Sequence, residues 1–215
     1  MSPTPTTTPT ANAMSLLVTL AKPNPDETDV FQGYVQESTA LAIEAGGEVS
    51  SRIGVRHLHG DAPAVVFGLA VFPSAQAIAE MFDGEAYRSL IPARDASIEC
   101  VNAYTVASPM LTELPALDDD AVFLVTVAAP NPDALEDLAA YQQAAGPLAA
   151  KHGGAPVAQL PIAAQPVGET PAAFIALAAF PSVDAVDAFF EDPEYRAIVE
   201  VRDRALSSLN LYVGR

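Results

Sequence analysis

The sequence contains no tryptophan and only one cysteine, Cys100. A single cysteine excludes a disulfide within the chain, so we expect a reducing, cytoplasmic location. Apolar runs such as residues 172–180 are much shorter than the roughly 20 residues that a membrane-spanning helix needs. Because half of the residues are nevertheless apolar, we expect a soluble globular protein with no membrane partner.

Basic residues are also scarce. Ten Lys and Arg stand against 27 Asp and Glu, which gives a formal net charge of −17. Phosphate groups would be repelled, so nucleic acid is not expected as a partner. The sequence also lacks a nucleophile elbow, a phosphate-binding glycine loop, a dinucleotide fingerprint and a metal-ligand spacing. We therefore expect no metal and no cofactor, and a small molecule as the ligand.

The most informative feature of the sequence is an internal repeat. The segment LVTLAKPNPD at residues 17–26 recurs as LVTVAAPNPD at 124–133, which is 107 residues later. Other identities keep this spacing or, after a one-residue insertion, a spacing of 108: Tyr34 with Tyr141, Gly46 with Gly153, Tyr87 with Tyr195, Arg94 with Arg202, Asn102 with Asn210 and Tyr104 with Tyr212. We therefore predict two copies of one domain at 14–108 and 121–215, a disordered tail at 1–13 and a linker at 109–120.

Within each copy the hydrophobic periodicity changes in a fixed order. In the first copy it predicts strands at 16–21, 48–57, 64–72 and 98–106. A helix is predicted from Asn24, which forms a capping box with Glu27, to Gly46. Helical material follows from residue 73 to 96, with breaks near Gly84 and Pro92.

The resulting order, β-α-β-β-α-β, is the ferredoxin-like plan. A sheet with helices on one face needs cover on its other face, and the second copy can provide it. We therefore predict an α+β fold in which two ferredoxin-like repeats form an intrachain pseudo-dimeric α/β barrel. Further homo-oligomerisation stays open.

The second copy resembles a known bacterial family. The segments YQQAAGPLAAKHGG at 141–154 and FPSVDAVDAFFEDPEYRAI at 180–198 are similar to the domain of unknown function 1330. The resemblance spans nearly all of 121–215. The first copy departs from the pattern at FDGEAYRSLIPARDA, residues 82–96, which lacks the proline before glutamate and gains Pro92.

The resemblance implies the fold of the dimeric α/β-barrel superfamily. Its members include cofactor-independent monooxygenases, haem-degrading enzymes, lactone isomerases, polyketide cyclases and stress-response proteins. Fold alone does not choose among these activities. The absence of tryptophan removes a residue type that some of the monooxygenases use.

Strand alternation selects a first set of candidate site residues. If the more apolar face of each sheet packs under the helices, polar side chains line the space between the two sheets: Thr19, Arg52, Asn102, Tyr104, Thr126, Gln159, Asn210 and Tyr212. An arginine there needs a counter-charge, and a carboxylate or enolate of a ligand could supply it. The alternative is that Arg52 pairs with Glu48 or Glu99 and the amide side chains only join the two halves.

A second cavity is expected between each sheet and its helices, where Tyr34 and Tyr141 lie on the apolar stripe of a helix. A tyrosine hydroxyl there could donate to a substrate oxygen or act as an acid. The alternative is a core tyrosine whose hydroxyl reaches the rim of the protein.

Together these features favour a cofactor-independent enzyme that isomerises, cyclises or oxygenates a small aromatic or polyketide-like metabolite. We predict Arg52, Asn102 and Tyr141 as catalytic residues. The predicted substrate-binding residues are Thr19, Tyr34, Tyr104, Thr126, Gln159, Asn210 and Tyr212. Two alternatives stay open: a non-catalytic small-molecule-binding or stress-related protein, and a fused scaffold with a filled interior.

Overall fold

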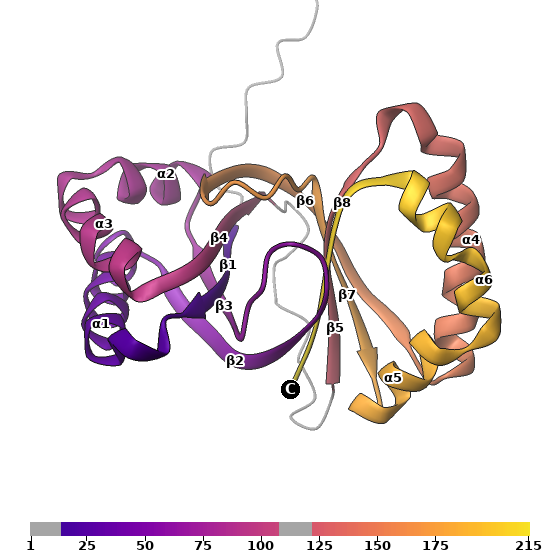
Figure 1. The fold of residues 1–215 in the computed structure, drawn as a ribbon. Coiled ribbons are helices and arrows are strands. Elements are labelled where there is room, and N and C mark those ends of the chain that lie inside the picture. The colour runs from indigo at the N-terminus through magenta and orange to yellow at the C-terminus, as the bar shows by residue number, and fades with distance from the viewer. Residues whose placement is uncertain (1–13, 108–121) are drawn as a thin grey trace, which may run out of the picture.

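The computed structural model describes residues 14–107 and 122–215, without the side chains of residues 50–52. The predicted tail at 1–13 and the predicted linker at 109–120 lie outside this part of the chain. Figure 1 shows a central barrel of strands with helices on two opposite sides. The described residues thus form an α+β protein, as predicted.

The two halves contain the same order of elements. The first half runs β1 (Ser15–Pro23), α1 (Thr28–Glu44), β2 (Glu48–His59), β3 (Val66–Phe72), α2 (Ala75–Asp83), α3 (Glu85–Ser97) and β4 (Ile98–Ala107). The second half runs β5 (Val122–Pro130), α4 (Leu135–Lys151), β6 (Ala155–Val167), β7 (Phe174–Phe180), α5 (Val183–Glu191), α6 (Pro193–Ala205) and β8 (Leu206–Gly214). A short 3-10 helix, Pro25–Glu27 or Pro132–Ala134, precedes the first helix of each half.

Two local predictions are wrong in detail. Asn24 does act as a cap, because its side chain accepts a hydrogen bond from the Asp26 N–H at 3.1 Å, but it caps the 3-10 helix. This extra turn separates Asn24 from α1, so the predicted capping box with Glu27 does not form. The break at Gly84 is confirmed, whereas α3 continues through Pro92, where the helix lacks one backbone donor.

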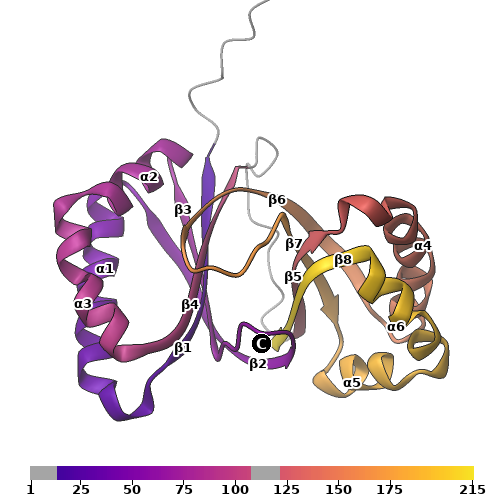
Figure 2. The ribbon, with the colours of Figure 1, turned by 45° about the horizontal axis from the view of Figure 1, so that its top comes forward.

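The eight strands close into one antiparallel barrel in the order β1-β3-β2-β8-β5-β7-β6-β4. The halves meet at two seams, where β2 pairs with β8 and β4 pairs with β6. Each set of helices covers the outer side of its own sheet (Figures 1 and 2). Closure of this kind leaves no sheet edge unpaired, because every strand has two neighbours.

Hydrophobic side chains form three clusters. One fills the barrel interior and draws on both halves, with Leu16, Val18, Tyr104, Val125 and Tyr212 among its members. The other two clusters lie between each sheet and its own helices. Strands β1 and β5 are therefore buried on both faces, which a simple polar and apolar alternation does not describe.

The second half holds the β2–β3 loop of the first half with two buried side chains. The Asn210 side-chain oxygen accepts the N–H of Ala62 at 2.9 Å, and the Tyr212 hydroxyl donates to the carbonyl of Ala62 at 2.7 Å. Gly60 has a φ of 100° and lies so close that a Cβ there would collide with Asn210. These contacts satisfy buried backbone groups that would otherwise be costly.

The first half holds the β6–β7 loop in the same way. The Asn102 side-chain oxygen accepts the N–H of Thr170 at 3.3 Å and an N–H of Gln165 at 3.2 Å. The Tyr104 hydroxyl donates to the Thr170 carbonyl at 3.4 Å. Gly168, with a φ of 93°, lies against Asn102 as Gly60 lies against Asn210. We call this reciprocal arrangement the loop clamp.

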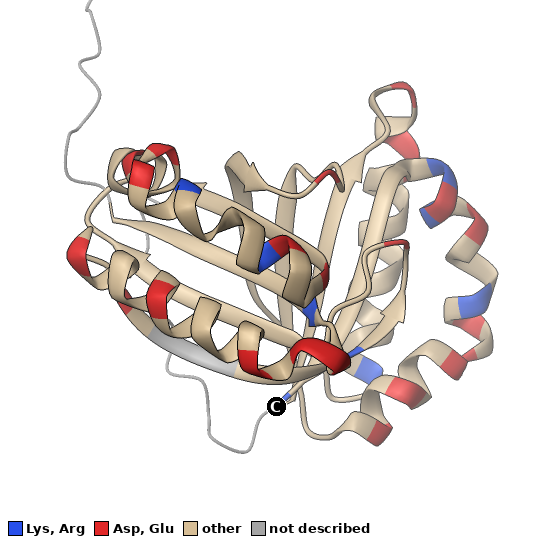
Figure 3. Ribbon diagram, turned by 60° about the vertical axis from the view of Figure 1, so that its left-hand side comes forward, with Lys and Arg blue, Asp and Glu red and all other residues tan. Residues whose placement is uncertain are grey.

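Figure 3 shows more Asp and Glu than Lys and Arg along the helices of both halves. No helix in the described residues is both long and apolar enough to cross a membrane.

The loop clamp requires a residue without a side chain at position 60. We expect Gly60→Ala to lower the free energy of unfolding by about 2 kcal/mol or more, because the new side chain is strained at positive φ and meets Asn210. Gly33→Ala in α1, where the added Cβ meets nothing within 4 Å, is the matched control and should stabilise by up to about 1 kcal/mol. Urea unfolding measures both, and equal stability of the two variants would contradict the clamp.

Candidate functional site

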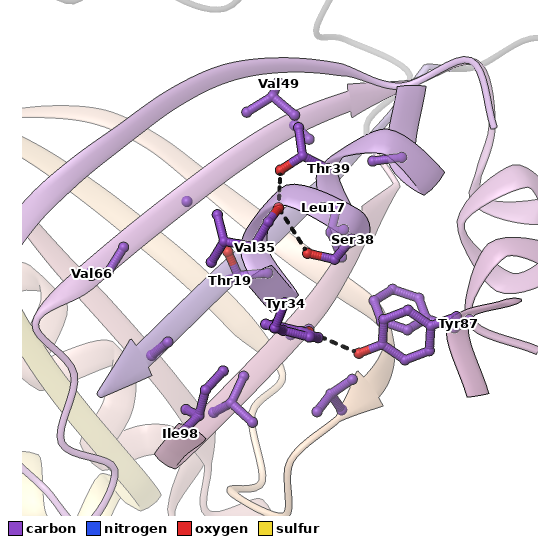
Figure 4. A pocket seen from close by; sticks show the side chains of 18 of the residues that line it. Leu17, Thr19, Tyr34, Val35, Ser38, Thr39, Val49, Val66, Tyr87 and Ile98 are labelled. Atoms are coloured by element: carbon purple, nitrogen blue, oxygen red, sulfur yellow. Dashed lines mark hydrogen bonds between the residues drawn. The ribbon is translucent and has the colours of Figure 1, made fainter. Parts of the chain in front are cut away.

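A pocket of about 320 Å³ lies in the first half between the sheet and its helices. Its floor includes Leu17 and Thr19 of β1 and Gly68 of β3, and its roof includes Phe31 and Tyr34 of α1. Figure 4 shows these layers, with the hydroxyl of Tyr34 directed at Tyr87. We call it the first-half pocket. The prediction of a cavity beside Tyr34 is thus confirmed.

The pocket exists because α1 does not fill the space above the sheet. Of its 17 residues, only Ala42 is buried. Ser38 and Thr39 face the sheet with short side chains that donate back to the Val35 carbonyl, at 3.3 and 2.6 Å. On the opposite wall Gly68 contributes no side chain at all. Small residues on both walls therefore leave room for a ligand.

A chain of hydrogen bonds ends at the pocket. The hydroxyl oxygens of Tyr34 and Tyr87 are 3.2 Å apart, and Arg94 Nη1 donates to the Tyr87 hydroxyl at 3.4 Å. Arg94 also forms an ion pair with Asp95 at 2.8 Å. Burial, followed by the neighbouring Tyr87, raises the pKa of Tyr34 well above its usual value. Tyr34 is therefore a neutral phenol at physiological pH.

The second half contains the same chain of bonds. Tyr141 and Tyr195 are 3.4 Å apart, and Arg202 Nη1 donates to Tyr195 at 3.1 Å. Burial raises the pKa of Tyr141 as it does for Tyr34. Sequence reasoning selected the two helix tyrosines but missed their partners. The signal was present, since Tyr87 and Arg94 recur as Tyr195 and Arg202 at one spacing.

The surroundings of the two tyrosine pairs differ. Met81 lines the first-half pocket, whereas its counterpart 108 residues later is Phe189, which is only 5% exposed. Phe190 packs on Tyr195 at 5.3 Å as Phe82 packs on Tyr87 at 4.6 Å. The difference between the halves is therefore Phe189, whose ring lies 4.3 Å from that of Tyr195.

A second pocket, of about 390 Å³, lies on the sheet of the second half. Its lining comes from the strands alone: Thr126, residues 156–159 and residues 176–178. Neither Tyr141 nor Tyr195 is part of this lining, whereas Tyr34 and Tyr87 both line the first-half pocket.

The predicted placement of Thr19, Thr126 and Gln159 between the sheets is wrong. Thr19 pairs in register with Gly68 and lies on the helix side of the sheet. Thr126 and Gln159 both pair with Ala176 and line the second-half pocket. The prediction failed because the barrel interior is the apolar face, whereas the sequence analysis assigned it to the polar residues.

The four residues predicted from the last strands do face the barrel interior: Asn102, Tyr104, Asn210 and Tyr212. Their polar atoms form the loop clamp. Asn102 and Asn210 therefore act as in the alternative interpretation above, in which the amide side chains join the two halves. The Cα of Arg52 pairs with Gly68, but its side chain lies outside the described residues. A catalytic role for Arg52, Asn102 or Tyr141 stays a prediction.

No group of three or more His, Cys, Asp or Glu side chains in the described residues could hold a metal ion. The described lining of the first-half pocket contains no Asp, Glu, His, Lys or Arg. Its polar groups are the hydroxyls of threonine, serine and tyrosine. Chemistry there would thus depend on hydrogen bonds from these hydroxyls.

Comparison with known proteins supports the fold. Residues 123–213 match the model of a family described as a domain of unknown function (DUF1330), which is less than half of the chain. No curated protein is detectably similar in sequence. An anthrone oxidase-like protein of known structure is 15% identical, with 95% of this chain and 92% of that chain covered and a TM-score of 0.59.

A mutant chlorite dismutase from Candidatus Nitrospira defluvii is 11% identical. The comparison covers 96% of this chain and 92% of that chain, with a TM-score of 0.54. Identities this low show the fold alone. The described chain therefore has the fold of dimeric α/β-barrel structures, and its second half matches the DUF1330 family model.

Asn210 provides a test of the clamp against a substrate-binding role. We expect Asn210→Ala to lower the free energy of unfolding by about 1–3 kcal/mol, because the buried N–H of Ala62 loses its acceptor. Thermal or urea unfolding measures this change. The affinity of the variant for a small-molecule ligand should equal that of the wild-type protein. A variant that keeps its stability but loses ligand binding would show that Asn210 belongs to a binding site instead.

Proposed function

We propose that the first-half pocket binds a small, flat, largely apolar metabolite with a carbonyl or phenolic oxygen. We further propose that the protein acts on it as a cofactor-independent enzyme of the isomerase, cyclase or monooxygenase type. The observation that carries this proposal is an apolar pocket lined by a hydrogen-bonded tyrosine pair. Its volume lies near the lower limit of ligand pockets, roughly 300–1,000 Å³, which favours a compact ligand of a few fused rings.

The lining suggests how such a ligand would be held. Apolar side chains of the sheet and α1 would exclude water from its rings, and Thr19 and Tyr34 would meet its oxygen atoms. Arg52 stays a predicted ligand-binding residue, because its Cα partner Gly68 belongs to the pocket floor. An aromatic metabolite that bears oxygen fits this combination of groups.

The intrachain pseudo-dimer is part of the same proposal. The repeated order of elements, the reciprocal loop clamp and the two tyrosine pairs support two diverged copies of one domain. In this account both copies keep a pocket on the sheet, but only the first-half pocket is lined by the tyrosine pair, and Phe189 packs beside Tyr195 in the second copy. The second copy would then act mainly as a scaffold.

A non-catalytic binding or stress-related role is the second candidate. The absence of carboxylate and imidazole groups from the described lining favours it, because the pocket then offers no conventional general base. Binding and turnover therefore need separate measurements.

Binding can be tested with 2-naphthol by isothermal titration calorimetry. We expect Ser38→Phe to weaken binding by roughly tenfold or more, because the added ring overfills the first-half pocket. Ala145→Phe, at the corresponding position of α4, is the matched control and should leave binding unchanged. Equal effects of the two variants, or no binding by the wild-type protein, would contradict the proposed site.

Turnover can be tested with anthrone, chosen because a protein of similar fold is named anthrone oxidase-like. Oxidation of anthrone by O₂ gives anthraquinone and water, and an oxygen electrode follows the reaction. We expect oxygen uptake above the rate without protein and a slower rate for Ser38→Phe. Binding of aromatic probes without any turnover would favour the non-catalytic role.

A further inference from the structure

The hydrogen-bond chain at the first-half pocket has a direction that follows from its chemistry. The guanidinium of Arg94 carries only donors, so the Tyr87 oxygen must accept in their bond. Tyr87 is 4% exposed, and in the described part of the chain its hydroxyl meets only Arg94 and Tyr34. A buried hydroxyl proton without an acceptor is costly, so Tyr87 must donate to the oxygen of Tyr34.

In this assignment the hydroxyl proton of Tyr34 has no acceptor among the described residues. The Tyr34 oxygen already accepts from Tyr87, so its own proton has to point elsewhere. No other partner of the Tyr34 hydroxyl is present among the described residues, and the side chain lines the first-half pocket. The free proton is therefore available to an acceptor within the pocket.

From this geometry we infer that Tyr34 donates its hydroxyl proton to the ligand, and that the ligand presents an oxygen that is negatively charged when bound or reacting, as in a phenolate or enolate. The inference rests on the proposed function of the pocket. The positive charge of Arg94, relayed through two polarised hydroxyls, strengthens the final hydrogen bond most when its acceptor is an anion. Tyr34 and Arg94 would thus act together on one oxygen of the ligand.

Two further observations agree with this direction. Burial raises the pKa of Tyr34, so its hydroxyl stays protonated and can donate a hydrogen bond to the ligand. Asp95 is 60% exposed at its side chain, so solvent weakens its ion pair with Arg94, whose side chain is 15% exposed. Arg94 is in this view a positioning and polarising residue, while Tyr34 touches the ligand.

A purely structural role would instead make the chain a tie between α1 and α3. The second half provides the comparison, because it has the same tie between α4 and α6. Tyr195 lines neither the first-half pocket nor the second pocket, so loss of its hydroxyl should leave ligand binding in the first-half pocket unchanged.

The test uses the full-length protein and two probes. 4-Nitrophenol reports its own ionisation, because the phenolate absorbs in the visible range and the phenol does not. 4-Nitroanisole has nearly the same shape but cannot ionise, so it reports pocket integrity. We expect the wild-type protein to bind the phenolate at least about fivefold more tightly than the phenol, since hydrogen bonds to charged groups are the stronger kind.

The variants are Tyr34→Phe, which removes the donor, and Tyr87→Phe, which disconnects Arg94. Both should reduce the preference for phenolate without changing the affinity for 4-nitroanisole. The second-half controls Tyr195→Phe and Ala145→Phe should leave the preference unchanged.

Three outcomes would overturn the inference. In the first, the wild-type protein prefers the neutral phenol, which would mean that Tyr34 accepts. In the second, the two first-half variants keep the full phenolate preference, and in the third the second-half controls lose as much of it. If neither probe binds, the proposed function fails first, and the inference that rests on it fails too.

Discussion

The structure depends on the closure of two half-sheets into one barrel. Because β2 pairs with β8 and β4 pairs with β6, the inner face of each sheet becomes a shared apolar core. The loop clamp strengthens this closure, since each half satisfies buried backbone groups of the other. An inner face that is filled in this way offers little space to a ligand. The outer faces, under the helices, are therefore where binding can develop.

The outer faces of the two half-sheets share several contacts and differ in others. Both keep an arginine and two tyrosines in a hydrogen-bonded chain, which ties the long helix to its neighbour. The first half combines this chain with small residues on α1 and β3, and a pocket results. The second half places Phe189 beside its tyrosine pair. The same chain of hydrogen bonds can therefore stabilise both halves, although, of the two pockets described, only the first-half pocket is lined by its tyrosines.

The sequence predicted the β-α-β-β-α-β order of elements in each half, because hydrophobic periodicity depends on local spacing. The repeat and the family resemblance together led to the predicted barrel. A cavity was expected beside both Tyr34 and Tyr141, and the first-half pocket lies beside Tyr34. It assigned Thr19 and Thr126 to the wrong face, because β1 and β5 are buried on both sides and their alternation is ambiguous. The same assumption, that the polar face is the inner one, misplaced Gln159 of β6. The repeat contained Tyr87 and Arg94, but not the information that their side chains bond to each other and to Tyr34. Arg94 and Tyr87 are seven residues apart and meet only when α3 forms.

The central claim is that the ligand site is the first-half pocket and that Tyr34 is its donor. A crystal structure of the protein with bound 2-naphthol tests this claim most directly. The account predicts one naphthol between α1 and the sheet, with its oxygen at hydrogen-bond distance from Tyr34 Oη. A ligand inside the barrel, or equal occupancy of both halves, would contradict it.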